Sequence, residues 1–190
     1  MTGGAILFAD LSPKRLQLLK EVVPKASRVA VLWNAANPAN AAAWSATEAA
    51  ARALGVTLRS HEVRSANDFE GAFARIAQQR PHAIHVLADA LTFQFRKQIA
   101  DFATEQRLSG VFDFREVVEA GGLVGYGPNL AEMLRRGGYY VDKILKGARP
   151  ADLPMEQPMK FEVVINMKTA KAFGLTIPPS LLLRADQLIE

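Results

Sequence analysis

The stretch Arg28-Val-Ala-Val-Leu-Trp-Asn34, followed by Ala35-Ala-Asn-Pro-Ala-Asn40, decides the fold. Val29 to Trp33 form a continuous apolar run that is too short for a helix, as expected of a strand buried on both faces. The asparagines and the proline that follow are turn and capping residues. Asn40 is the predicted N-cap of a helix that runs from Ala41 to Leu54 and ends at Gly55.

The same order of strand, loop and helix recurs at intervals of about thirty residues, which predicts an α/β fold with a doubly wound parallel sheet. The guessed strand order is 2-1-3-4-5, counted along the sequence from the strand at residue 28. An additional helix precedes that strand, with Ser12 as its predicted N-cap and Pro13 in its first turn. The other predicted strands cover residues 55–63, 82–88, 110–112 and 121–127.

The sequence changes in character after Gly147. Pro150, Pro154 and Pro158 recur every four residues, a density that disfavours a helix and favours an extended connector. One more strand is predicted at 161–165, followed by short helices at 168–173 and 180–184. We interpret this tail as part of a different module.

Composition excludes several classes of protein. The 190 residues have an ordinary apolar content and no apolar run near twenty residues, so we expect no transmembrane helix. The absence of cysteine excludes disulfides and thiolate chemistry. The net charge of +4 is spread along the chain, with 10 Lys and Arg against 7 Asp and Glu in residues 1–95, and 13 against 12 in residues 96–190. We therefore expect no nucleic-acid partner.

The sequence contains no nucleophile elbow, no P-loop and no metal-ligand cluster. His82 and His85 are three apart on a predicted strand, so they point to opposite faces and cannot share a metal. Gly125-Tyr-Gly127 lacks the third glycine of a dinucleotide-binding loop. We expect no enzyme activity, no cofactor and no metal.

Polar residues follow the predicted strands at their carboxyl ends, where ligands bind in open α/β sheets. They are either turn and capping residues or a binding site. We predict that five of them line one concavity: Asn34, Asn40, Asp89, Arg115 and Tyr126. In this prediction Arg115 clamps a ligand carboxylate, because a guanidinium can hold one in bidentate fashion; the alternative is a surface ion pair with a neighbouring acid.

Three stretches resemble the substrate-binding components of ABC-type importers, which have the periplasmic-binding type I fold. The first covers Lys14–Glu21, Pro24 and Arg28–Asn34, and the second covers Arg115–Gly127. The third, and most specific, is the tail, with Leu153-Pro-Met-Glu-Gln-Pro158, Phe161-Glu-Val-Val-Ile-Asn166 and Lys168 to Ser180. The resemblance covers nearly the whole chain.

The resemblance implies two α/β lobes with a ligand cleft between them. Residues 1–127 would form the second lobe, and residues 128–190 a crossover helix and tail that belong to an incomplete first lobe. The chain resembles a truncated form or fragment, because the signal and most of the first lobe are missing from it. The family is periplasmic, whereas this chain as written would remain in the cytoplasm.

The resemblance implies the solute-binding component of an ABC-type importer, with a small-molecule ligand such as an amino acid or a related carboxylate and a transporter permease as partner. Self-association through the exposed tail is a further expectation. One alternative is a stand-alone α/β enzyme of flavodoxin-like architecture, which needs a general base or a cofactor loop. Another is the effector-binding domain of a regulator, which needs a preceding helix-turn-helix.

Overall fold

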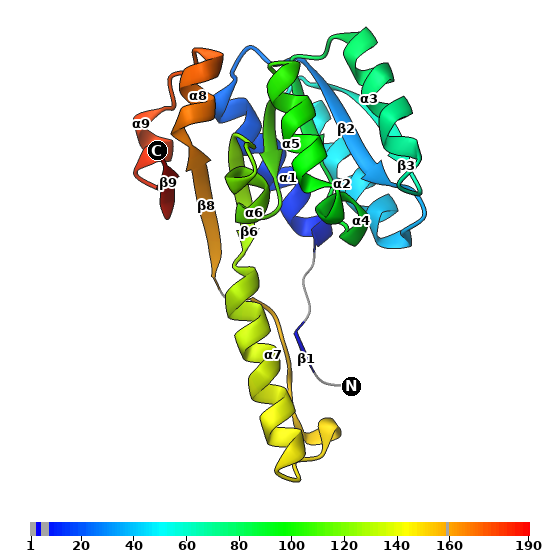
Figure 1. The fold of residues 1–190 in the computed structure, drawn as a ribbon, viewed down its shortest axis with the longest axis vertical. Helices are drawn as coiled ribbons and strands as arrows, with labels where there is room; N and C mark the ends of the chain where they lie inside the picture. The colour runs from blue at the N-terminus through cyan, green and yellow to red at the C-terminus, as the bar shows by residue number, and fades with distance from the viewer. Residues whose placement is uncertain (1–2, 5–7, 159) are drawn as a thin grey trace.

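The computed structural model describes residues 3–4, 8–158 and 160–190. Its body is a seven-stranded sheet covered by helices on both faces (Figure 1). Across the sheet the strands are β3 (Thr57–Val63), β2 (Arg28–Asn34), β4 (Ala83–Val86), β5 (Ser109–Phe112), β6 (Val124–Pro128), β8 (Phe161–Asn166) and β9 (Gln187–Ile189). The first five strands are parallel and stand in the predicted order 2-1-3-4-5, which confirms the doubly wound sheet.

The apolar strands are buried because helices cover both faces of the sheet. α1 (Phe8–Val22), α2 (Pro38–Ala53), α8 (Met167–Phe173) and α9 (Pro179–Leu182) contribute to one core cluster. α3 (Asp68–Gln79), α5 (Arg96–Glu105) and α6 (Arg115–Glu119) contribute to the other. Val29 and Val31 face the first cluster, and Ala30 and Leu32 the second, so the central strand β2 is buried on both sides as its sequence predicts.

Two predicted helix starts are wrong by a few residues. α1 begins at Phe8, before the predicted cap at Ser12, and contains Pro13. α2 is capped by Asn37, whose side chain accepts a hydrogen bond from the Ala39 backbone N–H, with Pro38 in the first turn. The helix therefore starts before Asn40, because Asn37 offers a capping oxygen and proline in the first turn has no N–H to satisfy.

The tail from residue 161 lies on the same sheet, which differs from the prediction that residues 128–190 belong to another lobe. β8 pairs antiparallel with β6, and β9, which the sequence did not indicate, pairs parallel with β8. Asn166 caps α8, as predicted, and its side chain also donates a hydrogen bond to the Val118 carbonyl on α6. Val163 and Ile165 are buried in the core cluster that also contains residues of α1 and α2, so the apolar side chains of β8 pack within the body.

Residues 129–158 form a separate arm that extends away from the body (Figure 1). It consists of α7 (Leu130–Leu145), the 3-10 turn η1 (Pro150–Asp152) and β7 (Met155–Glu156), which pairs parallel with β1 (Gly3–Gly4). Asn129 caps α7 as predicted, by accepting a hydrogen bond from the Glu132 backbone N–H. Within α7, Tyr140 is the single buried residue.

Within the described ranges, no helix combines the length and the hydropathy that a membrane span requires.

Candidate functional site

Two of the predicted site residues meet at the carboxyl ends of the neighbouring strands β2 and β4. The side-chain amide of Asn34 donates a 2.8 Å hydrogen bond to Oδ1 of Asp89. Asp89 also caps α4 (Ala90–Gln94), because its Oδ1 accepts a 2.8 Å hydrogen bond from the Leu91 backbone N–H. The two residues, 55 positions apart in the sequence, were predicted to share one edge of the sheet, and the hydrogen bond between them was not predicted.

Asn37 is the site residue that the prediction left out. Its side-chain amide donates a 2.7 Å hydrogen bond to Oδ2 of Asp89, while its own oxygen caps α2. The Asp89 carboxylate is therefore held by two carboxamides and one backbone N–H. The asparagine before a proline was a usable signal, because that pair marks a helix start and so fixes the side chain beside the strand end.

A surface hollow of about 530 Å³ lies over this cluster. Its walls come from the loop after β2 and from the beginning of α4. The lining residues are Asn34, Ala36, Asn37, Pro38, Asp89, Ala90, Leu91 and Gln94. The hollow thus combines apolar walls with a small group of oriented polar side chains, the usual composition of a small-molecule site.

Asn40 does not line the hollow. It is buried within α2, and its side-chain amide donates a 3.3 Å hydrogen bond to the Asn34 backbone carbonyl. Asn40 therefore supports the loop that presents Asn34.

Arg115 follows β5 and so lies on the same edge of the sheet, but its guanidinium is engaged within the chain. It donates hydrogen bonds to Glu119, one turn later in α6, and to Gln187 of β9. Its Nη1 also lies 4.0 Å from Glu162 of β8. These contacts tie α6 to the last two strands, and Arg115 is absent from the hollow beside Asp89.

Tyr126 is the middle residue of β6, one position past the last residue that pairs with β5, and is half-buried with its ring centroid 6.1 Å from that of Phe161 on β8. Its backbone carbonyl accepts a 2.7 Å hydrogen bond from Nε of Arg15. The structure therefore places all five predicted residues near the carboxyl edge, and of these Asn34 and Asp89 line the hollow.

Two buried ionisable residues, which sequence reasoning missed, lie on α1 and directly after β5: Arg15 and Asp113 influence each other electrostatically, although no ion pair joins them among the described residues. Arg15 and Asp113 are both almost completely buried. Burial raises the pKa of Asp113 to about 6, although the nearby Arg15 acts in the opposite direction. Helical spacing was the available signal, since Arg15 lies four residues before Leu19 and seven before Val22 on the apolar face of α1.

His85 lies in the middle of β4 and is completely buried. Burial lowers its pKa to about 3, and the positive charge of Arg15 acts in the same direction. The imidazole is therefore neutral at physiological pH. His82 lies just before the start of β4, exposed, and its ring accepts a hydrogen bond from the Ser27 backbone N–H.

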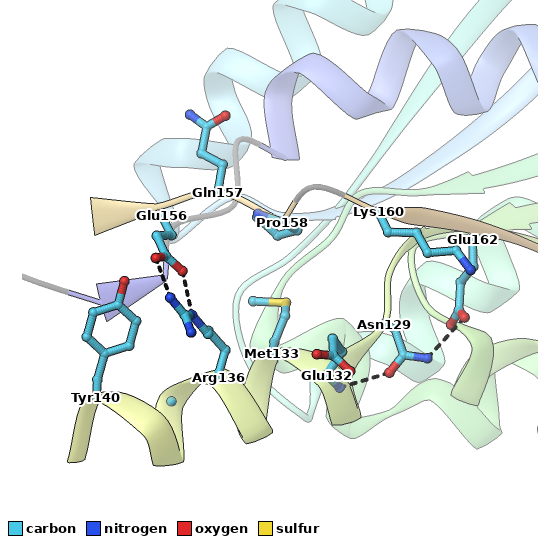
Figure 2. A pocket seen from close by; sticks show the side chains of 11 residues that line it. Asn129, Glu132, Met133, Arg136, Tyr140, Glu156, Gln157, Pro158, Lys160 and Glu162 are labelled. Atoms are coloured by element: carbon cyan, nitrogen blue, oxygen red, sulfur yellow. Dashed lines mark hydrogen bonds and ion pairs between the residues drawn. The ribbon is translucent and has the colours of Figure 1, made fainter. Parts of the chain in front are cut away.

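A larger hollow of about 1000 Å³ lies between α7 and the segment before β8 (Figure 2). Several of its polar groups are paired within the chain: Arg136 donates two hydrogen bonds to Glu156, and Asn129 donates one to Glu162. Tyr140 donates its hydroxyl hydrogen to the Pro154 carbonyl. None of the five predicted residues lines this hollow. It lies where the arm joins β8, whereas the Asp89 hollow lies at the carboxyl ends of β2 and β4.

Across the described residues, no three His, Cys, Asp or Glu side chains are arranged to hold a metal ion. The fold and the edge cluster define a class of protein: an α/β lobe that presents polar side chains at the carboxyl ends of a parallel sheet.

The sequence profile of the ABC transporter substrate binding protein family matches residues 9–189. The chain belongs to this family, and its fold is consistent with the periplasmic-binding type I fold. A search of curated proteins finds no match.

Solved structures share the fold. An ABC domain in complex with L-Trp from Streptococcus pneumonia is 24% identical, with a TM-score of 0.84 over 94% of this chain and 62% of its own. A conserved domain protein from Vibrio cholerae is 22% identical, with a TM-score of 0.84 over 93% and 60%. A LacI family transcriptional regulator from Bifidobacterium animalis reaches a TM-score of 0.59 at 16% identity, over 84% and 60%. The chain thus spans about 60% of the length of these structures.

Proposed function

We propose that this chain is the solute-binding component of an ABC-type importer and that its ligand is a small molecule, such as an amino acid or a related compound. The observation that carries the proposal is the Asn34–Asp89–Asn37 cluster beneath a hollow at the carboxyl edge of the sheet. Family membership and the fold shared with an L-Trp complex support it.

We propose that the ligand reaches this edge in a cleft between two lobes. Residues 1–127 contribute the second lobe, to which the sheet pairing now adds residues 161–190. The arm at 129–158 is the part of the tail that fits the predicted crossover to a first lobe, because it leaves the body and exposes large apolar side chains. Asn40, Arg115 and Tyr126 shape the same edge without lining the hollow.

In this proposal the protein acts by binding and not by catalysis. Ligand binding closes two lobes, and the closed form is what a transporter permease recognises. The permease and the periplasmic location follow from the family, and both are part of the proposal.

Isothermal titration calorimetry with amino acids, nucleosides and sugars tests the binding function on the purified chain. We expect saturable binding of one solute class, weakened by Asn34→Ala. Asp101→Asn is a matched control, because Asp101 is an exposed carboxylate on α5 that pairs with Lys97 outside the hollow. Binding that Asp101→Asn and Asn34→Ala weaken equally, or no binding by any class, contradicts the proposed function.

We also propose that the isolated chain self-associates through the arm. Leu134, Val141 and Leu145 are exposed along α7, and an unpaired apolar surface of this kind favours association. Light scattering at tens of micromolar tests the proposal, with Leu134→Glu expected to shift the chain toward monomer. A monomeric parent chain contradicts it.

A further inference from the structure

We propose that the hollow at Asp89 recognises a positively charged ammonium group, so that the ligand is an amine and its amino end docks here. The inference rests on the proposed function, and it names the chemical class that this part of the edge selects. It differs from the sequence prediction, in which Arg115 recognised a carboxylate.

The first argument is the hydrogen-bonding capacity of the Asp89 carboxylate. Its Oδ1 accepts two hydrogen bonds, from the Asn34 side chain and the Leu91 backbone. Its Oδ2 accepts one, from the Asn37 side chain. A carboxylate oxygen has two lone pairs, so Oδ2 retains one acceptor position. Because Asp89 lines the hollow, this position suits a donor that enters from there.

The second argument is charge. The residues that line the hollow include no Lys, Arg or His, and Asp89 is their single acidic residue. Among the ion pairs found within the described ranges, none involves Asp89. Its three donors are neutral groups, which orient the carboxylate without cancelling its charge. A half-buried negative charge without a cationic partner favours a cationic ligand.

The third argument is that the site is held in place before any ligand arrives. The side-chain oxygen of Asn34 accepts a 2.9 Å hydrogen bond from the Ala36 backbone N–H. That of Asn37 accepts a 3.0 Å hydrogen bond from the Ala39 backbone N–H. Both carboxamides are therefore fixed with their NH₂ groups toward Asp89. Such a preorganised acceptor loses little conformational entropy on binding.

Two other ligand groups fit less well. A carboxylate would be repelled by Asp89, and Arg115 is engaged with Glu119 and Gln187 instead of facing this hollow. A divalent metal needs several oxygen ligands, whereas the hollow offers one carboxylate. An ammonium group carries one positive charge and three directional donors, so one carboxylate with a free acceptor position is sufficient.

The test uses the purified chain and two small probes, methylammonium chloride and sodium acetate, at matched ionic strength. Nitrogen–proton NMR follows the backbone N–H of Leu91 and the side-chain NH₂ signals of Asn34 and Asn37, all of which bond to Asp89. We expect these signals to shift in a saturable manner with methylammonium and not with acetate. Saturation by acetate, or no saturation by methylammonium, overturns the proposal.

Two variants and one control define the role of the charge. Asp89→Asn keeps an oxygen that can cap α4, and we expect it to weaken methylammonium binding at least about tenfold. Asn37→Asp keeps the capping oxygen of α2 and adds a negative charge, so we expect tighter binding. Asp101→Asn is expected to change nothing. Unchanged affinity in both pocket variants overturns the proposal even if the parent chain binds methylammonium.

The outcome is separable from that of the proposed function. A chain that binds a solute in the calorimetric screen but shows no methylammonium response keeps its function and loses this inference. A chain that responds to methylammonium through Asp89 but binds no solute in the screen keeps the inference and loses the function.

Discussion

The body and the arm of this chain use apolar residues in opposite ways. In the body, Leu16 and Leu19 of α1 are completely buried against the sheet. In the arm, Leu134 is 77% exposed and Leu145 is 82% exposed, although α7 is as long as α2. Both regions contain well-capped helices. The difference lies in what the helices pack against, since the stability of a protein helix comes mainly from the burial of an apolar face.

The comparison shows that the body buries its own apolar side chains and the arm does not. Charged pairs within the arm, such as Lys146 with Asp142, are exposed and add little stability. The candidate site lies in the body, on strand ends that the sheet fixes. The arm instead carries an apolar surface that the body does not cover.

The largest expected effect comes from a glycine in the body. A Cβ at Gly127 would overlap the backbone carbonyl oxygen of Asp113, which a side-chain rotation cannot relieve. We expect Gly127→Ala to lower the free energy of unfolding by about 3 kcal/mol or more. Gly138→Ala in α7 is the matched control, because nothing lies within 4 Å of its added Cβ. We expect no loss there and a gain of about 0.5–1 kcal/mol in helix stability. Urea denaturation measures both, and equal losses would remove the distinction between the two regions.

Two leucine truncations test the comparison directly. Leu19→Ala removes a completely buried side chain, and we expect a loss of about 2–5 kcal/mol in the free energy of unfolding. Leu134→Ala removes an exposed side chain, and we expect a change within about 0.5 kcal/mol. Thermal unfolding of dilute protein measures the difference. A large loss from Leu134→Ala would show that the arm is packed in solution.

Acid stability sharpens the comparison within the body. The pKa of His85 is about 3 in the folded chain and 6.5 by its ordinary value, so below pH 6.5 the unfolded chain binds a proton that the folded chain does not. Stability is therefore lost as pH falls from about 6.5 to 3, by about 2 kcal/mol between pH 7 and 5. Asp113 has the opposite effect on stability. Its pKa is about 6 in the folded chain and 3.8 by its ordinary value, so the folded chain binds this proton at a higher pH than the unfolded chain and gains stability as pH falls.

The variant His85→Leu isolates the histidine contribution to acid stability. We expect the difference in unfolding free energy between the parent chain and His85→Leu to change by about 2 kcal/mol between pH 7 and 5, in favour of the variant at low pH. His82→Gln is the control, since His82 is exposed. Parallel pH profiles for the parent chain and His85→Leu would contradict a buried neutral histidine.

Part of the candidate site was predictable from the sequence. Asn34 and Asp89 each follow an apolar strand, and parallel neighbouring strands bring their carboxyl ends to one edge. Asn40 and Arg115 were predicted at the correct edge, but the sequence could not show that one is buried in α2 and the other bonded to Gln187. Such contacts depend on side chains that are distant in sequence, which local patterns do not specify.

The sequence by itself determined the parallel sheet and the caps at Asn129 and Asn166, because these depend on burial periodicity and on hydrogen bonds between near neighbours. The strand order was inferred by analogy with other open α/β sheets. Only the tertiary structure decided that β8 and β9 extend the same sheet and that the arm stands apart. An apolar strand or helix face must be buried, but the sequence pattern does not specify which other element packs against it. The pairing of β8 with β6 buries Val163 and Ile165, whereas Leu134 on the arm remains exposed.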